Sequence, residues 1–106
     1  MKKISDNTAV NKFVSIRNSA DSRGIEFNMT INRIKQLLSA KRCFISGVEL
    51  NDIIDDDNKL TFDRLDNTKG YIDSNVVACS LKMNRLKASL TLEEIKMLYK
   101  AISKIK

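Results

Sequence analysis

A chain of 106 residues, 42% apolar and with a formal net charge of +6, has the size of one small domain with a single hydrophobic core. No apolar run exceeds four residues, far short of the roughly 18 that a membrane span needs, so we expect no membrane association. The opening MKKISDNTAV has no apolar segment behind its lysines and does not resemble a secretory signal. We therefore expect a cytoplasmic protein in which Cys43 and Cys79 are reduced thiols.

Charge is distributed unevenly along the chain. Residues 1–48 carry nine basic and three acidic side chains, and residues 67–106 carry eight basic and three acidic ones. Residues 49–66 hold seven acids beside Lys59 and Arg64. Cations that bind phosphates on both sides of carboxylates that bind a metal would suit an enzyme acting on nucleic acid. The alternative is a solvated surface with a run of charge, which is common in small basic domains.

The first part of the chain predicts two helices. Residues 8–22 have an apolar side and precede Gly24, a residue type that commonly ends helices. Residues 25–27 alternate, as a short strand or an extended connector does. Thr30 can cap a second helix, whose apolar residues recur at helical spacing: Ile31, Ile34, Leu37 and Leu38.

The middle of the chain predicts extended structure and a polar loop. Residues 42–50 have the pattern of a strand, a turn at Gly47 and a returning strand. Residues 51–58 are polar and predict a loop. The acids at positions 55–57 lack the alternating spacing of a calcium-binding loop, so we assign no metal site to them.

A strand, a turn and a buried run follow. Residues 60–63 alternate, and residues 66–70 are rich in turn-forming types. From Asn75 an apolar run predicts a buried segment that passes into a helix ending near Lys87.

The last predicted helix covers residues 92–105 and is the most strongly patterned. Thr91 and Glu94 have the spacing of a capping box. One stripe of the helix is apolar, and lysines four residues apart occupy another face. Together, these elements predict one α+β domain spanning residues 1–106.

Four short motifs between Leu60 and Thr91 stand in a fixed order: Asp63-Arg64-Leu65-Asp66-Asn67, Lys69-Gly70-Tyr71, Asn75-Val76-Val77 and Asn84-Arg85-Leu86-Lys87. They resemble those of the HNH, or His-Me finger, nucleases, and above all small HNH-like proteins of bacteriophages. The resemblance implies a ββα-metal unit, a two-stranded ribbon followed by a helix, at residues 42–90, with a helical extension at 1–41 and a C-terminal helix at 91–106.

The resemblance implies a phage-encoded, metal-dependent endonuclease that hydrolyses DNA phosphodiester bonds in the host cytoplasm. It assigns binding of Mg²⁺ (or Mn²⁺) to Asp63 and Asn84, whose oxygens suit a hard cation. It assigns to Asn75 the role of stabilising the ribbon by hydrogen bonds to the ribbon's backbone. DNA is the expected partner, with RNA left open. The cations that can bind phosphates are Arg17, Arg23, Lys69, Lys82, Arg85 and Lys87.

One departure from the family concerns the general base. Arg64 follows Asp63 where the best-known HNH enzymes have a His, and the chain contains no His. Arginine, with a pKa above about 12, cannot accept the proton, but it can bind the phosphate or stabilise the transition state. The base would be a metal-bound hydroxide, a carboxylate such as Asp66, or bulk water. Enzymatic activity therefore stays open. The alternatives are a nucleic-acid-binding protein with a degenerate HNH fold, or a phage inhibitor or regulator that binds a host protein.

A second departure concerns zinc. Many HNH domains bind structural zinc through two Cys-x-x-Cys pairs, but three of the four matching positions here are not cysteines. We therefore expect no structural zinc and instead a small apolar cluster of Ile45, Val48, Leu81 and Met83. The four matching positions are Cys43, Ser46, Ser80 and Met83.

Overall fold

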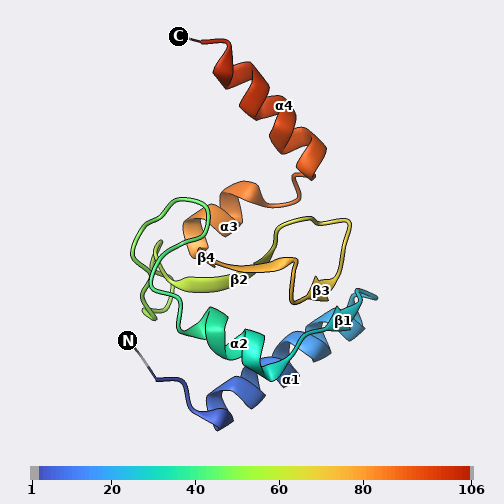
Figure 1. The fold of residues 1–106 in the computed structure, drawn as a ribbon, viewed down its shortest axis with the longest axis vertical. Helices are drawn as coiled ribbons and strands as arrows, with labels where there is room; N and C mark the ends of the chain where they lie inside the picture. Colours follow the sequence, from blue (N-terminus) through green and yellow to red (C-terminus); the bar gives the residue numbers. More distant parts are fainter. Residues whose placement is uncertain (1–2, 106) are drawn as a thin grey trace.

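The computed structural model describes residues 3–105 and has an α+β architecture (Figure 1). Four helices accompany two small two-stranded sheets. No helix within this described range is long and apolar enough to cross a bilayer. The elements in chain order are α1 (Asp6–Ser22), β1 (Phe27–Asn28), α2 (Ile31–Leu38), β2 (Leu60–Arg64), β3 (Tyr71–Ile72), β4 (Val76–Ser80), α3 (Leu81–Lys87) and α4 (Leu92–Ser103).

Each helix begins at a hydroxyl side chain that caps it. Thr30 accepts a hydrogen bond from the backbone of Arg33, which confirms the predicted start of α2. Thr91 and Glu94 make both bonds of the predicted capping box, and α4 ends at Ser103. α1 begins two residues earlier than predicted, because Ser5 caps it. Such a cap typically contributes about 1 kcal/mol.

The central feature is an antiparallel ribbon of β2 and β4. Phe62 pairs with Ala78, and Asp63 pairs with Val77. The helix α3 follows β4 without a loop, since Ser80 both ends the strand and caps the helix. α3 lies on one side of the ribbon, and α1 and α2 lie on the other (Figure 1).

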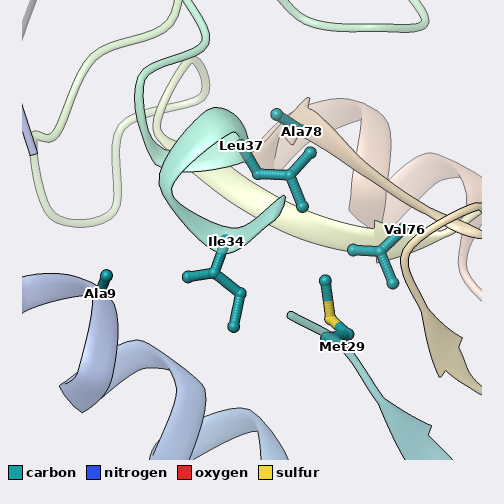
Figure 2. Close-up of a cluster of buried hydrophobic side chains, with 6 residues drawn as sticks. All are labelled: Ala9, Met29, Ile34, Leu37, Val76 and Ala78. Carbon is teal, nitrogen blue, oxygen red and sulfur yellow. The ribbon is translucent and has the colours of Figure 1, made fainter. Parts of the chain in front are cut away.

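Strand β4 supplies the core on both sides of the ribbon, because successive residues of a strand point to opposite faces. All five of its residues are buried. Val76 and Ala78 pack into the main cluster with side chains of α1 and α2 (Figure 2). Val77 and Cys79 face the other way and pack with Cys43. The members of the main cluster are Ala9, Met29, Ile34, Leu37, Val76 and Ala78.

A second sheet joins distant parts of the chain. β1 and β3 pair in parallel, with Phe27 opposite Tyr71. Gly70 lies where the two segments approach most closely. A Cβ built on it would be 2.5 Å from the carbonyl oxygen of Glu26, the group that accepts a hydrogen bond from the amide of Tyr71. Only a residue without a side chain fits there without a shift of the backbone.

The prediction of two strands within residues 42–50 is wrong. The segment forms a tight turn in which the amide of Gly47 donates to the carbonyl of Cys43, and only a single bridge joins Arg42 and Glu49. The left-handed φ of +76° at Gly47 closes the loop before strands can extend. The polar loop predicted at 51–58 contains no helix or strand, in agreement with the prediction.

The predicted composition of the second cluster is also corrected. Ile45 and Val48 are 40% and 37% exposed because the turn directs them to solvent. Cys43, Val77 and Cys79 form the cluster instead, with Met83 packed against it.

Helix α4 extends away from the rest of the molecule (Figure 1). None of its residues is buried. The apolar stripe predicted for this helix therefore faces solvent, with Leu98 and Ile102 52% and 66% exposed.

Candidate functional site

The candidate site lies between β2 and α3. Asp63 and Thr61 are two residues apart in β2, so their side chains share the face that α3 covers. Asn84 and Lys87 are three residues apart in α3, so they share the face that looks back at the strand. The fold thus brings Asp63 and Asn84 to the same interface, where Thr61 and Lys87 also lie.

Asp63 is a buried carboxylate with one cationic neighbour. The residue is 7% exposed, and its Oδ2 lies 3.3 Å from Nζ of Lys87. The contact is an ion pair without hydrogen-bond geometry, which leaves this buried oxygen without a hydrogen bond within residues 3–105. Burial raises the pKa of Asp63, and the charges of Lys87 and Arg64 oppose that rise. A buried oxygen with an unused lone pair is costly for the protein unless a ligand satisfies it.

Lys87 acts inside the protein rather than at its surface. Only 6% of the residue is exposed. Its ammonium donates to the carbonyl of Arg64 at 2.8 Å and to Oδ1 of Asn67 at 3.1 Å, and it pairs with Asp63. The ammonium thus donates two hydrogen bonds to the protein and has the carboxylate of Asp63 as an ion-pair partner. This buried placement speaks against the prediction that Lys87 binds phosphate, because the ammonium is turned toward acceptors inside the protein.

Hydrogen bonds fix the amide of Asn84. Its Nδ2 donates to Oγ1 of Thr61 at 3.0 Å and more weakly to the carbonyl of Phe62 at 3.4 Å. Thr61 donates its own proton to the carbonyl of Cys79, so its oxygen must accept from Asn84. The amide oxygen of Asn84 consequently faces away from these acceptors and takes part in no hydrogen bond with the described residues.

The donor set fits a hard divalent cation. One carboxylate oxygen and one amide oxygen, both free of hydrogen bonds, come from facing elements, and Mg²⁺ commonly takes one or two protein oxygens and keeps several waters. Across residues 3–105 there is no cluster of three or more His, Cys, Asp or Glu side chains suited to a metal. A cation held here would therefore complete its coordination with water or substrate oxygens. The nearby Lys87 ammonium would weaken its binding by repulsion.

Asn75 and Arg64 stabilise the loop at residues 66–70. Asn75 is buried and exchanges two hydrogen bonds with the backbone of Asp66, donating a third to the carbonyl of Gly70. Nη1 of Arg64 donates to the carbonyls of Asn67 and Lys69 at 3.2 and 2.9 Å. Both side chains therefore bind backbone, and Arg64 also lies 5.2 Å from the ring centroid of Tyr71.

Asp66, the carboxylate considered as a base, makes hydrogen bonds of its own. It accepts from the amide and the hydroxyl of Thr68 at 2.9 and 2.6 Å. These bonds lower the pKa of Asp66, which makes it a weaker base than an ordinary aspartate.

The remaining predicted cations fall on two sides of the ribbon. Lys82 and Arg85 are exposed on α3, and Lys69 is exposed in the loop at 66–70. Arg17 and Arg23 are also exposed and belong to α1 and its C-terminal end, and Nη1 of Arg23 donates to the hydroxyl of Tyr71 at 3.1 Å. Lys82 and Arg85 therefore share a helix with Asn84, whereas Arg17 and Arg23 belong to the part of the chain on the other side of the ribbon.

Sequence reasoning missed two residues of this site. One is Thr61, which orients Asn84. Its position two residues before Asp63 in a predicted strand could have indicated that it shares a face with Asp63. Asn67 connects Lys87 to the segment after α3, since its Nδ2 donates to the carbonyl of Leu90 at 2.9 Å. No sequence pattern points to that contact, because it joins a loop to a chain segment 23 residues away.

Cys43 and Cys79 are buried and belong to the same apolar cluster. Sγ of Cys43 accepts a hydrogen bond from the amide of Ser46 at 3.4 Å. Burial opposes ionisation of Cys43, but hydrogen bonds from Ser46, and to a lesser extent Ser80 and Ile45, lower its pKa to about 6. Burial and the neighbouring charges of Cys43 and Asp63 raise the pKa of Cys79 to about 12. Only one of the two thiols is therefore readily ionised.

Comparison with known proteins relates the chain to a bacteriophage protein. It is 40% identical over 77 residues to the "Uncharacterized 29.0 kDa protein in dda-modA intergenic region" of Enterobacteria phage T4. The match covers 73% of this chain and 31% of the phage protein, so the chain spans about a third of that relative's length. No family model and no solved structure matches the chain. The chain is thus phage-related.

Proposed function

We propose that the protein is an HNH-like, metal-dependent endonuclease that hydrolyses DNA phosphodiester bonds. The observation that carries the proposal is the pair of oxygens without hydrogen bonds, on Asp63 and Asn84, at the interface of β2 and α3. The order of the ribbon and α3 is compatible with the ββα-metal unit that the sequence resembles. The relationship to a phage protein supports a phage origin.

In this proposal, Asp63 and Asn84 hold Mg²⁺ or Mn²⁺, which offsets negative charge at the scissile phosphate. Thr61 keeps the amide oxygen of Asn84 available, and Lys87 keeps the carboxylate of Asp63 ionised. Asn75 holds the loop beside the site. The exposed cations Lys69, Lys82 and Arg85 bind phosphates on either side of the cleaved bond.

Proton removal from the attacking water is the weak step of this mechanism. The chain has no imidazole, and Asp66 has a lowered pKa. A general base typically contributes about 10²–10⁴ in rate. We therefore expect slow cleavage that becomes faster as the pH rises and hydroxide becomes more available.

The test is nicking of supercoiled plasmid DNA in Mg²⁺ or Mn²⁺. Asp63→Asn and Asn84→Ala should each abolish cleavage, since the first removes the negative charge of the carboxylate and the second removes the amide oxygen. The matched control is Asp57→Asn, the same chemical change at an exposed acid of the polar loop. Equal nicking by all four proteins would identify a contaminating nuclease. Crystals soaked with Mn²⁺ should show an ion within about 2.0–2.5 Å of oxygens from both Asp63 and Asn84.

A second candidate is a nucleic-acid-binding protein with a degenerate HNH fold. The ion pair of Asp63 with Lys87 favours it, because the ammonium already neutralises the carboxylate. Salt-sensitive DNA binding without cleavage in any divalent ion would support this candidate over the endonuclease. The exposed apolar stripe of α4 favours a third candidate, a regulator that binds a host protein. A complex that survives nuclease treatment would support it.

A further inference from the structure

We propose that the groove between α1 and β2 is a second phosphate-binding site, in which Lys12 and Lys59 together hold a phosphate group of a nucleic-acid strand. The proposal goes beyond endonuclease activity, since it requires binding alone. The groove lies on the face of the ribbon opposite Asp63.

The position follows from the alternation of β2. Thr61 and Asp63 point toward α3, so Leu60 and Phe62 point toward α1 and α2, where they pack against the main cluster. Nζ of Lys12 lies 4.9 Å from the ring centroid of Phe62 and is therefore on the α1 side. A ligand bound by Lys12 would not overlap with the candidate metal site.

The groove consists of two adjoining hollows of about 540 and 280 Å³. Both are lined by Lys12, Lys59 and Leu60, so the two lysines stand where the hollows meet. Hydroxyl groups, which can donate to phosphate oxygens, contribute to both linings: Ser5 and Thr8 in the larger hollow, and Ser15, Ser19 and Tyr71 in the smaller. Apolar residues and one acid, Asp52, also line the larger hollow.

No ion pair with a carboxylate is formed by Lys12 or Lys59 within residues 3–105, where the ion-paired lysines are Lys35 and Lys87. Burial, and then repulsion by Lys59, lower the pKa of Lys12. Both costs would be relieved by an anion between the two ammonium groups.

The chemistry of the groove selects a phosphate group over a carboxylate. Two ammonium groups and several hydroxyls can serve the separate oxygens of a phosphate, and lysine binds phosphate as a point charge. The groove also continues past the lysines in both directions, as a site for one residue of a strand requires. A strand bound there and contacts made by α3 would lie on opposite faces of the ribbon.

The experiment measures binding of a fluorescent single-stranded oligonucleotide by anisotropy over a series of salt concentrations. The variants are Lys12→Gln, Lys59→Gln and the double variant. The matched control is Lys100→Gln, which removes the same charge from the exposed face of α4. Each groove substitution should reduce the salt slope by about 0.7, the value for one contact with a single strand, and the double variant by about 1.4, with no change in the control.

Equal slopes for the double variant and Lys100→Gln would overturn the proposal. A second arm titrates inorganic phosphate and follows the side-chain resonance of Lys12 by NMR. If free phosphate shifts this resonance while the oligonucleotide slopes stay equal, the groove binds a small anion, and the nucleic-acid proposal is wrong. Lys12→Met, which retains the apolar stem against Phe62, repeats the test if Lys12→Gln unfolds.

Failure of the groove and failure of the nuclease are distinguishable. Asp63→Asn should lose cleavage and keep the salt slope of the wild type. Lys59→Gln should change the slope whether or not the protein cleaves DNA.

Discussion

Lys87 shows how a residue typical of a surface can serve an internal function. In the sequence it lies two residues after Arg85, and the pattern predicts one more exposed cation on a helix. In the structure it joins β2, the loop at 66–70 and α3 through three contacts. Its ammonium and the carboxylate of Asp63 are both nearly buried, and the charge of Lys87 opposes the rise that burial causes in the pKa of Asp63.

We predict that Lys87→Met destabilises the protein at neutral pH by about 3 kcal/mol, because it leaves Asp63 buried without a counter-charge. Mg²⁺ should also stabilise this variant more than it stabilises the wild type, because the ammonium that competes with a metal at Asp63 is absent. Addition of Mg²⁺ should therefore raise the midpoint of thermal unfolding further in the variant than in the wild type. Circular dichroism melts with and without Mg²⁺ measure both effects. Lys82→Met, an exposed neighbour, is the control and should change neither. A metal response equal to that of the wild type would speak against metal binding at Asp63.

The thiols provide a prediction of pH dependence. With a pKa near 6, Cys43 should ionise as the pH rises through about 6, whereas Cys79, with a pKa near 12, stays protonated. Because the pKa of Cys43 is lowered from 9.0, the stability from its ionisation is complete above pH 9 and is lost as the pH falls through about 6. Thiolate absorbance in the ultraviolet measures the titration. The step near pH 6 should vanish in Cys43→Ser and persist in Cys79→Ser.

At the scale of elements, the fold depends on contacts between segments far apart in sequence. The parallel pairing of β1 and β3 joins residues 27–28 to residues 71–72. The pairing is two residues long, so it depends on close approach of the backbone at Gly70.

We predict that Gly70→Ala destabilises the protein by about 2 kcal/mol, because its methyl group would overlap the backbone of Glu26. Chemical denaturation measures the change. The comparison variant is Gly24→Ala, where the added carbon meets open space and the cost, from a φ of +66°, is only about 1 kcal/mol. A smaller loss at Gly70 than at Gly24 would contradict the close approach.

Much of the helical structure could be predicted from sequence because its signals are local. The starts of α2 and α4 are set by a cap at Thr30 and by the capping box of Thr91 and Glu94. Each of these signals involves no more than four consecutive residues. The strands predicted on either side of Gly47 are absent, because a short apolar segment beside a turn has the same local pattern whether it extends or loops. The β1–β3 pairing has no local signal, and the burial of Lys87 follows only from the position of α3 on the ribbon.

At the scale of the whole molecule, the core and α4 are separate in energetic terms. β4 contributes to both apolar clusters, whereas α4 contributes no buried side chain. The amphipathic pattern of α4 was predicted correctly, but pattern alone does not reveal whether a partner surface exists within the same chain.

We predict that removal of residues 92–106 shifts the midpoint of thermal unfolding by less than about 4 °C, since it exposes no core. Ile34→Ala, which opens a cavity in the main cluster, should cost about 2–5 kcal/mol and lower the midpoint far more. Differential scanning calorimetry compares the two. A larger loss from the truncation than from Ile34→Ala would mean that α4 packs against the domain in solution.

The isolation of α4 also makes it a handle for experiments on single molecules. A dye or a surface linkage attached to its solvent-facing side would sit apart from the ribbon and would not alter the charges around Asp63. Immobilised in this way, the protein could be tested for the proposed binding of DNA while both faces of the ribbon remain accessible. A pulling force on this helix would reach β4 through the backbone of α3, because no core side chain connects α4 to the rest of the domain.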